Sequence, residues 1–197
     1  MVKEQFEKEN NILDAAISIF SEKGYYSTTI DMIAEAASIG KGTVYLYFSS
    51  KEEILAKIIN RAMVGQNKET KEAFKINDAY KRLRAILEAG KVFLGDNATL
   101  ASVLVTESMK ALKNPEFRDR ADDLYTEYLN LLIHALELGQ RDGAFRNDFS
   151  PTTVGSLLIS LRTGMLVELL RIGTTEISDD LIVDAMDFIF KGIGSVH

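Results

Sequence analysis

Between Thr28 and Glu53 the sequence predicts two short helices joined by a tight turn, followed by the start of a third helix. A hydroxyl at Thr28 or Thr29 can accept hydrogen bonds from the free N–H groups that begin the first helix. Ile39 is the apolar residue of the turn, and Gly40 is expected to relieve the backbone at the bend. The apolar residues of the first helix recur at helical spacing: Ile30, Ile33, Ala34 and Ala37. This arrangement is typical of a helix-turn-helix.

The second short helix is expected over residues 41–48 and presents polar groups on its outer side. Val44 and Phe48 are four residues apart and therefore face inward. Gly42 would let backbone lie close to a phosphate. Lysine and threonine near a helix N-terminus suit base edges and phosphates, and tyrosine hydroxyls donate to phosphate oxygens. The side chains left outside are Lys41, Thr43, Tyr45 and Tyr47. The pattern predicts a helix that enters the major groove of DNA.

The charge distribution bears on how tightly such a helix can bind. Ser50 and Glu53 form a predicted capping box, and the helix that they begin brings its positive end and Lys51 near the recognition helix, an arrangement suited to a backbone phosphate. The net charge is −6, and the first 51 residues hold five lysines against seven acidic residues. We therefore expect weak non-specific DNA affinity and reliance on base contacts and dimer geometry.

These residues resemble the N-terminal signature of TetR-type transcriptional regulators. Phe20, Gly24 and Tyr25 precede the helix-turn-helix at the family's spacing, and the likeness covers about the first quarter of the chain. Two positions depart from the family pattern, which often has glycine where Ser38 stands and a polar cap where Gly40 stands. The resemblance assigns DNA contact to Thr29, Lys41, Gly42, Thr43, Tyr45, Tyr47 and Lys51. We add the neighbouring Thr28 to this predicted DNA-binding set.

The pattern is helical throughout the chain. Pro115 and Pro151 each follow a cap residue and mark helix starts. Besides the two helices of the helix-turn-helix, helices are expected over residues 3–23, 51–74, 78–94, 98–112, 115–141, 151–172 and 178–193. The first of these is expected to turn Phe6 inward. The predicted fold is all-α with about nine helices: a DNA-binding domain over residues 1–50 and an effector-binding and dimerisation domain over residues 51–197.

The last two predicted helices are apolar on more than one side. A helix of this kind must bury both sides, and one side can face its own core while the other faces an identical subunit. A two-fold dimer built as a four-helix bundle follows, with Gly155, Gly164 and Gly192 allowing close packing. TetR-like proteins dimerise in this way, which presents two recognition helices ~34 Å apart to a palindrome. The alternative is that both helices lie at the centre of a monomer core.

Polar residues within apolar helix faces mark a candidate effector pocket in the middle of the chain. Arg162 could receive an anionic head group above an apolar chamber. The alternative for Arg162 is a structural ion pair with Glu107 or Glu168. His134 is another polar residue among apolar ones, and its alternative to a ligand contact is a surface or packed position. The candidate ligand-binding residues are Phe93, Glu107, Met109, Tyr125, Tyr128, Arg162 and Met165.

The segment 139–146, GQRDGAFR, resembles TetR-type regulators with lipophilic effectors, including acyl-CoA-responsive ones. It suggests a fatty-acyl or other hydrophobic effector. The alternative is that Arg141 and Arg146 only cap the helix end and brace the loop.

The composition argues against several other classes of protein. Without cysteine there is neither a disulfide nor a thiolate metal site, and two histidines cannot build a His-rich one. We find no nucleophile with a base at a plausible spacing and no glycine-rich phosphate loop, so no enzyme, cofactor or metal is expected. No apolar run reaches the ~20 residues of a membrane span, and the polar N-terminus is unlike a signal peptide, which fits a cytoplasmic protein.

The predicted function is therefore a ligand-responsive repressor that binds a palindromic operator in double-stranded DNA as a homodimer and is released by a small lipophilic effector. The alternative is a helical, dimeric ligand-binding protein without specific DNA binding.

Overall fold

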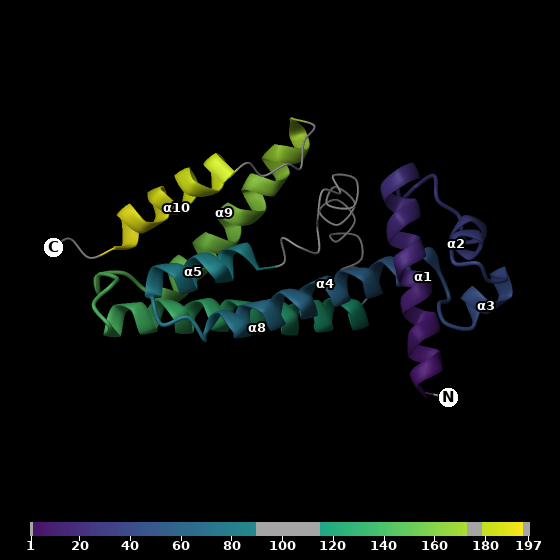
Figure 1. Cartoon of the computed structure of the whole chain (residues 1–197), viewed down its shortest axis with the longest axis horizontal. Coiled ribbons are helices and arrows are strands. Elements are labelled where there is room, and N and C mark those ends of the chain that lie inside the picture. Colours follow the sequence, from purple (N-terminus) through teal and green to yellow (C-terminus); the bar gives the residue numbers. More distant parts are fainter. Residues whose placement is uncertain (1, 90–114, 173–178, 195–197) are drawn as a thin grey trace. The chain divides into compact units, whose positions relative to one another are not determined.

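The computed structural model describes residues 2–89, 115–172 and 179–194 (Figure 1). Within these ranges the secondary structure is helical, apart from one isolated backbone bridge between Phe145 and Gly194. The prediction of an all-α fold is confirmed. The helices are α1 (Val2–Lys23), α2 (Ile30–Ala36), α3 (Lys41–Tyr45), α4 (Lys51–Ala73), α5 (Ala79–Glu88), α8 (Pro115–Arg141), α9 (Pro151–Arg171) and α10 (Asp179–Ile193).

Most predicted helix boundaries agree with these within one or two residues, and two are wrong. The helix expected over residues 78–94 ends at Glu88, because Ala89 turns the backbone to an extended conformation (ψ 137°). Gly90 follows in the sequence and has a low helix propensity. The helix expected over residues 41–48 is α-helical only to Tyr45 and closes with a turn. The helix expected over residues 98–112 lies outside the described residues.

The chain forms two compact units, which divide inside α4, between Ala62 and Met63, and again inside α8, between Ala121 and Asp122. The first unit contains α1, α2, α3, the first half of α4 and the start of α8. Gly24 ends α1 in the left-handed region (φ 79°), where a residue without Cβ is favoured. In this unit α2 packs against both α1 and α3. Its fully buried side chains are Ile12, Ala16, Phe20, Ile33, Val44, Phe48, Ile54 and Ile58.

The expectation that α1 turns Phe6 inward is wrong. Its side chain is 64% exposed, so it does not belong to the core of the first unit. The buried side chains of α1 begin one and a half turns later, at Ile12. Helical periodicity alone could not show where along α1 the packing against neighbouring helices starts.

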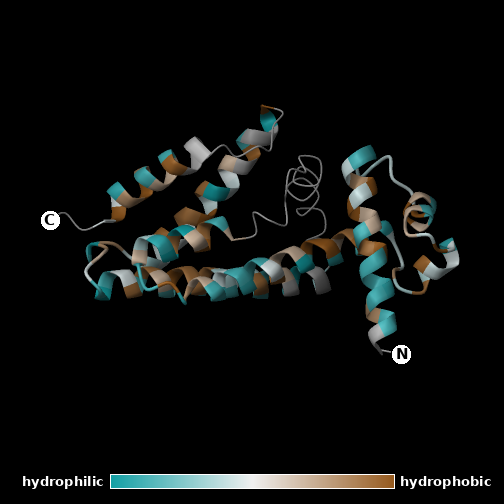
Figure 2. Ribbon diagram, in the orientation of Figure 1, coloured by the Kyte–Doolittle hydropathy of each residue, from teal (hydrophilic) through white to brown (hydrophobic). Residues whose placement is uncertain are grey.

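The second unit has its own core. It is built from buried side chains of α4, α5, α8, α9 and α10 and the loop after α8: Ala73, Ala79, Leu83, Ile86, Leu87, Tyr128, Leu132, Ala135, Leu136, Phe145, Leu158, Ile189 and Ile193. Figure 2 shows hydrophobic residues recurring along α8 between hydrophilic ones, as an amphipathic helix requires. Gly155 packs α9 against α8, since a Cβ there would lie 3.3 Å from Leu129.

The segment 139–146 ends α8 and seals this core. Phe145 is fully buried, and its ring lies so close to Gly139 that a Cβ on that glycine would be 2.2 Å away. Gly143 adopts a positive φ of 74°, and the Gln140 amide donates to the carbonyl oxygens of Arg146 and Phe149. These contacts account for much of the motif as a loop that closes a helix, which was the alternative to an effector signature.

Candidate nucleic-acid interface

The helix-turn-helix is held by local backbone contacts. Thr29 caps α2, and its Oγ1 accepts a hydrogen bond from the Met32 N–H at 3.3 Å. Asn11 of α1 donates to the Ala37 carbonyl oxygen at 2.9 Å and anchors the end of α2. The residue in the left-handed region is Ser38 (φ 56°), whereas Gly40 is extended (φ −72°, ψ 146°). The expectation that Gly40 relieves the bend is therefore wrong, because the turn places the strained conformation two residues earlier.

The recognition helix α3 has one buried side and an exposed remainder. Val44 and Phe48 are almost completely buried, and the N–H groups of Tyr47 and Phe48 both donate to the Val44 carbonyl oxygen, which closes the helix. Burying a side chain of this size stabilises the fold by roughly 1.5–3 kcal/mol. The polar candidates surround the exposed part: Lys41, Gly42 and Tyr45 are exposed, and Thr43 and Tyr47 are half-buried.

Thr28 is a correction to the predicted DNA-binding set. Its side chain is only 2% exposed, and its hydroxyl donates to the Gly24 carbonyl oxygen at 2.8 Å. The hydroxyl therefore braces the connection between α1 and α2 and does not face a DNA surface. The adjacent Thr29 is exposed and acts as the cap. The sequence left open which threonine caps α2, since either hydroxyl could do so.

Lys51 is held by backbone oxygens within the same unit. Its Nζ donates to the carbonyl oxygens of Tyr25 (2.7 Å) and Thr28 (2.9 Å) and lies 4.4 Å from the centre of the Tyr25 ring. The lysine thus joins the start of α4 to the loop before α2. A positive charge remains at this place, but its hydrogen bonds order the loop.

The capping box at the start of α4 is formed as predicted in one half only, because Glu53 bonds to Ser49 and not to Ser50. Ser50 Oγ accepts from the Glu53 N–H at 3.1 Å, as expected. The Glu53 carboxylate, however, accepts from both the N–H and the hydroxyl of Ser49 at 2.7 Å. Three hydrogen bonds therefore fix the link between the recognition helix and α4.

Lys41 forms an ion pair with Asp31 across the two helices of the motif. The Nζ–Oδ2 distance is 2.7 Å, and the hydrogen bond to Asp31 raises the pKa of the Lys41 ammonium group above its ordinary value. Both side chains are exposed, so the pair contributes little to stability. Its importance is electrostatic, because a carboxylate beside Lys41 competes with any phosphate for the same ammonium group.

In the second unit, Arg162 contacts Tyr128, another residue of the candidate effector set. Arg162 Nη1 donates to the Tyr128 hydroxyl at 3.4 Å, and that hydroxyl donates to the Ile86 carbonyl oxygen at 3.2 Å. Burial raises the pKa of Tyr128 above its ordinary value, while Arg162 opposes the shift. Met165 is half-buried, and Tyr125 is 44% exposed.

The alternative to an effector contact for Arg162 is a structural ion pair with Glu107 or Glu168. Glu168 pairs instead with Arg171, three residues on in α9, so that half of the alternative is corrected. Helical spacing favours the i,i+3 partner over a residue six positions away. Three candidates lie outside the described residues: Phe93, Glu107 and Met109.

A polar cluster between α4 and α8 was missed by sequence reasoning. The buried Asn67 side chain donates to the Leu124 carbonyl oxygen (3.1 Å) and to the Glu127 carboxylate (2.8 Å). Lys71 donates to the other oxygen of the same carboxylate. We call these three side chains, Asn67, Lys71 and Glu127, the α4–α8 latch. Glu127 is 56 residues or more from the two others in the sequence, so no local pattern could reveal the contact.

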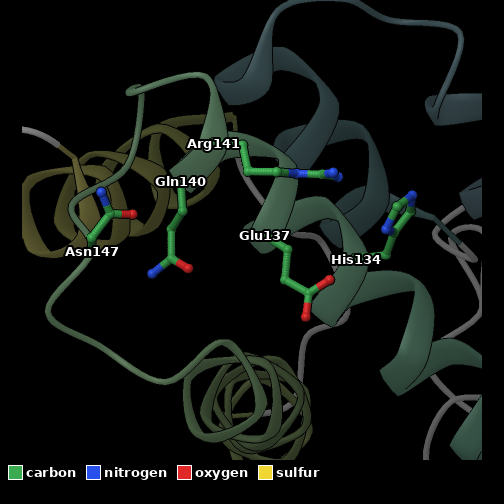
Figure 3. Close-up of a pocket in the computed structure, with 5 residues that line it drawn as sticks. All are labelled: His134, Glu137, Gln140, Arg141 and Asn147. Atoms are coloured by element: carbon green, nitrogen blue, oxygen red, sulfur yellow. The ribbon is translucent and has the colours of Figure 1, made fainter.

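A polar groove of about 700 Å³ runs along the C-terminal part of α8 (Figure 3). Its lining residues are His134, Glu137, Gln140, Arg141 and Asn147. His134 is exposed and stacks on the Phe74 ring, with 5.3 Å between the ring centres. The groove is open and shares no residue with the predicted effector set, and His134 is the surface residue that the alternative described.

Across the described ranges, no helix combines the length and apolar character needed to cross a bilayer. The same residues contain no group of three potential metal-ligating side chains.

The sequence of the helix-turn-helix and of much of the chain is similar to that of known proteins. Residues 12–58 match the model of the bacterial regulatory proteins of the tetR family. The chain is 31% identical over 147 residues to the fatty acid metabolism regulator protein of Bacillus subtilis strain 168, covering 74% of each chain. It is 25% identical over 206 residues to the HTH-type transcriptional repressor KstR2 of Rhodococcus jostii strain RHA1, covering 96% of this chain and 93% of that one.

The fold agrees with solved structures as well. The TetR family transcriptional regulator PfmR from Thermus thermophilus superimposes with a TM-score of 0.74 at 26% identity, over 94% of this chain and 99% of that one. The similarity extends from the helix-turn-helix through the C-terminal helices, which the motif alone could not show. Helix-turn-helix geometry, an all-α body and a relative above 30% identity lead to one conclusion: this chain belongs to the TetR family of DNA-binding transcriptional regulators.

Proposed function

We propose that this regulator is a repressor that binds a palindromic operator as a homodimer and leaves it when a small, lipophilic, anionic effector binds. The observation that carries the DNA part is the exposed side of α3. Lys41 and Tyr45 are exposed there, and the fold does not need them for packing, because the buried side chains of Val44 and Phe48 hold the helix in place. Polar and aromatic groups of this kind suit phosphates and base edges. A repressor of bacterial genes acts in the cytoplasm, where the DNA lies.

The dimer proposal rests on the exposed apolar side chains of α9 and α10. Phe188 is 75% exposed, and Gly164 and Gly192 would each have open space around a Cβ. Gly155, by contrast, packs within its own chain. Large apolar side chains exposed on two neighbouring elements in the sequence favour association with a second copy. The other exposed large apolar side chains of α9 and α10 are Leu157, Leu161, Val167 and Val183, and Ile172 follows directly after α9.

The effector proposal rests on Arg162. Its guanidinium group contacts the Tyr128 hydroxyl next to the apolar core of the second unit, and Glu168 is paired elsewhere. A half-buried cation beside apolar side chains suits a ligand with an anionic head and an apolar body. A similar Bacillus subtilis protein is a regulator of fatty acid metabolism, which supports a fatty-acyl effector.

The mechanism requires that the effector bind the two conformations of the protein unequally. A ligand with the same affinity for the DNA-bound and the released states cannot change the DNA affinity. Since α4 contributes residues to both compact units, we propose that it carries the change to the helix-turn-helix. Equal operator affinity with and without a saturating acyl-CoA would contradict this part of the proposal.

The decisive experiment is selection of genomic fragments by the purified full-length protein at ~0.1–0.15 M salt, where non-specific contacts are screened. We expect an enriched palindrome. Tyr45→Ala should lose affinity for it without losing its fold, since that side chain is half exposed. Absence of enrichment, also after denaturing removal of bound ligand and refolding, would favour a ligand-binding protein without specific DNA binding.

A further inference from the structure

Leu46 has the most exposed side chain among the large apolar residues that the structure describes, at 83%. A single exposed leucine is common on protein surfaces, so the exposure alone means little. Its place is informative. Leu46 follows directly on α3 and keeps helical backbone angles (φ −74°, ψ −20°), between Tyr45 and Tyr47. The core of the first unit is closed by Val44 and Phe48 without it.

Helical spacing divides the residues of this turn into four rows, because positions four apart lie on one face. Val44 and Phe48 form the buried row. Gly42 and Leu46 form the opposite row and are both exposed. The two remaining rows flank them: Lys41 with Tyr45, and Thr43 with Tyr47. Leu46 therefore lies at the apex of the exposed side, with polar and aromatic groups on both flanks.

A helix that enters the major groove presents its apex to the base edges and its flanks to the sugar–phosphate walls. Gly42 has no side chain, and the space where a Cβ would stand is open. Leu46 is thus the side chain placed to meet the bases. An isobutyl group cannot form hydrogen bonds, and the apolar group that base pairs offer in the major groove is the C5-methyl of thymine.

We infer that Leu46 is a specificity-determining residue that packs against a thymine methyl in each half-site. The inference rests on the proposed function, since it presumes that α3 enters the groove of an operator. Burial of one methyl group changes affinity by about fourfold, the equivalent of ~0.8 kcal/mol. Two symmetric half-sites together change it by roughly fifteenfold.

The test uses the enriched operator and replaces each symmetric pair of thymines by deoxyuridine, which removes only the methyl groups. Affinities are measured by fluorescence anisotropy with the full-length protein. We expect the wild type to lose about fifteenfold at one pair of positions. Leu46→Ala should bind the thymine and deoxyuridine duplexes equally at that pair, with an unchanged unfolding midpoint because the side chain is exposed.

Tyr45→Phe is the matched control, since it removes a hydroxyl from the flank and leaves the apex intact. It should weaken binding to both duplexes by the same factor and keep the methyl dependence. If no deoxyuridine pair changes the wild-type affinity, or if Leu46→Ala keeps the discrimination, the inference is overturned while the operator itself remains. If no sequence is enriched in the selection, the proposed function fails together with it.

Discussion

Gly42 is the residue at which stability and function should separate most clearly. It lies within α3, and a Cβ there would meet no atom within 4 Å. Gly42→Ala should therefore stabilise the protein by about 0.5–1 kcal/mol, the usual gain of alanine over glycine in a helix. If the backbone at this place lies close to the DNA, as the family resemblance implies, the added methyl should lower operator affinity by about tenfold or more.

The measurements are urea unfolding and operator binding on the same preparations. Gly65→Ala in α4 is the control, because a Cβ at Gly65 also meets open space. It should stabilise the protein to a similar degree and leave DNA affinity unchanged. Equal affinities of the Gly42→Ala variant and the wild type would show that the glycine serves no close approach to DNA.

Ser38 carries backbone strain that glycine would relieve. Its φ of 56° lies in the left-handed region, where a Cβ is unfavourable. We expect Ser38→Gly to raise the free energy of unfolding by up to about 1 kcal/mol, measured by urea denaturation. Ser38→Ala keeps the strain and should show no gain. A gain of equal size in both variants would mean that the serine hydroxyl, and not the backbone, is unfavourable.

At the scale of whole helices, the α4–α8 latch yields a prediction with a defined pH dependence. Hydrogen bonds from Lys71 and then Asn67 lower the pKa of the Glu127 carboxyl group below its ordinary value of 4.5. A carboxyl group with a lowered pKa stabilises the fold above that ordinary value, and its contribution is lost as the pH falls through the folded-state pKa. Glu127→Gln should therefore lower the unfolding midpoint at pH 7, and the difference from wild type should shrink in acid.

Glu72→Gln provides the matched control for the latch. Glu72, near the end of α4, pairs with Lys75 in the turn that follows, and this pair also lowers the pKa of its carboxyl group. An exposed pair of this kind contributes little, and it joins no second helix. We expect a smaller change in the midpoint for Glu72→Gln. If the two variants were indistinguishable at pH 7, Glu127 would not be holding α4 to α8.

At the scale of the whole molecule, the proposed dimer places its requirement on α10. Phe188→Glu would set a charge where the partner helix is proposed to pack, and burying it unpaired is costly. We expect a monomer by light scattering at micromolar concentration. Operator affinity should fall by roughly a hundredfold or more, because one half-site alone is held. Val64→Glu, an exposed apolar position on α4, should remain dimeric. A dimeric Phe188→Glu variant would move the interface elsewhere.

Much of the fold could be predicted because helices depend on local patterns. The bounds of α4 and α8 follow from caps, prolines and apolar spacing, and the inward faces of Val44 and Phe48 follow from positions four residues apart. The end of α5 could not be predicted in this way. Apolar residues continue in the sequence after Glu88, at Ala89 and over residues 92–94, but the backbone leaves the helix at Ala89.

The candidate site was predictable to the extent that it depends on neighbours in the sequence. The exposed row of Lys41 and Tyr45 follows from helical spacing, whereas the ion pair of Lys41 with Asp31 needs the angle at which α2 meets α3. Leu46 was passed over because an apolar residue in a helix is usually assigned to a core. Helical spacing sets it opposite Val44, and its 83% exposure shows that no neighbouring element covers it.

The sequence by itself determined the helical class, the position of the helix-turn-helix and the family. Each of these depends on spacings of a few residues, which a chain keeps in any packing. Tertiary structure decided that Thr28 is buried while Thr29 caps a helix, that Ser38 takes the strained conformation, and that Asn67 and Lys71 meet Glu127. Burial and pairing depend on groups brought together by folding from distant parts of the chain, and no local pattern contains that information.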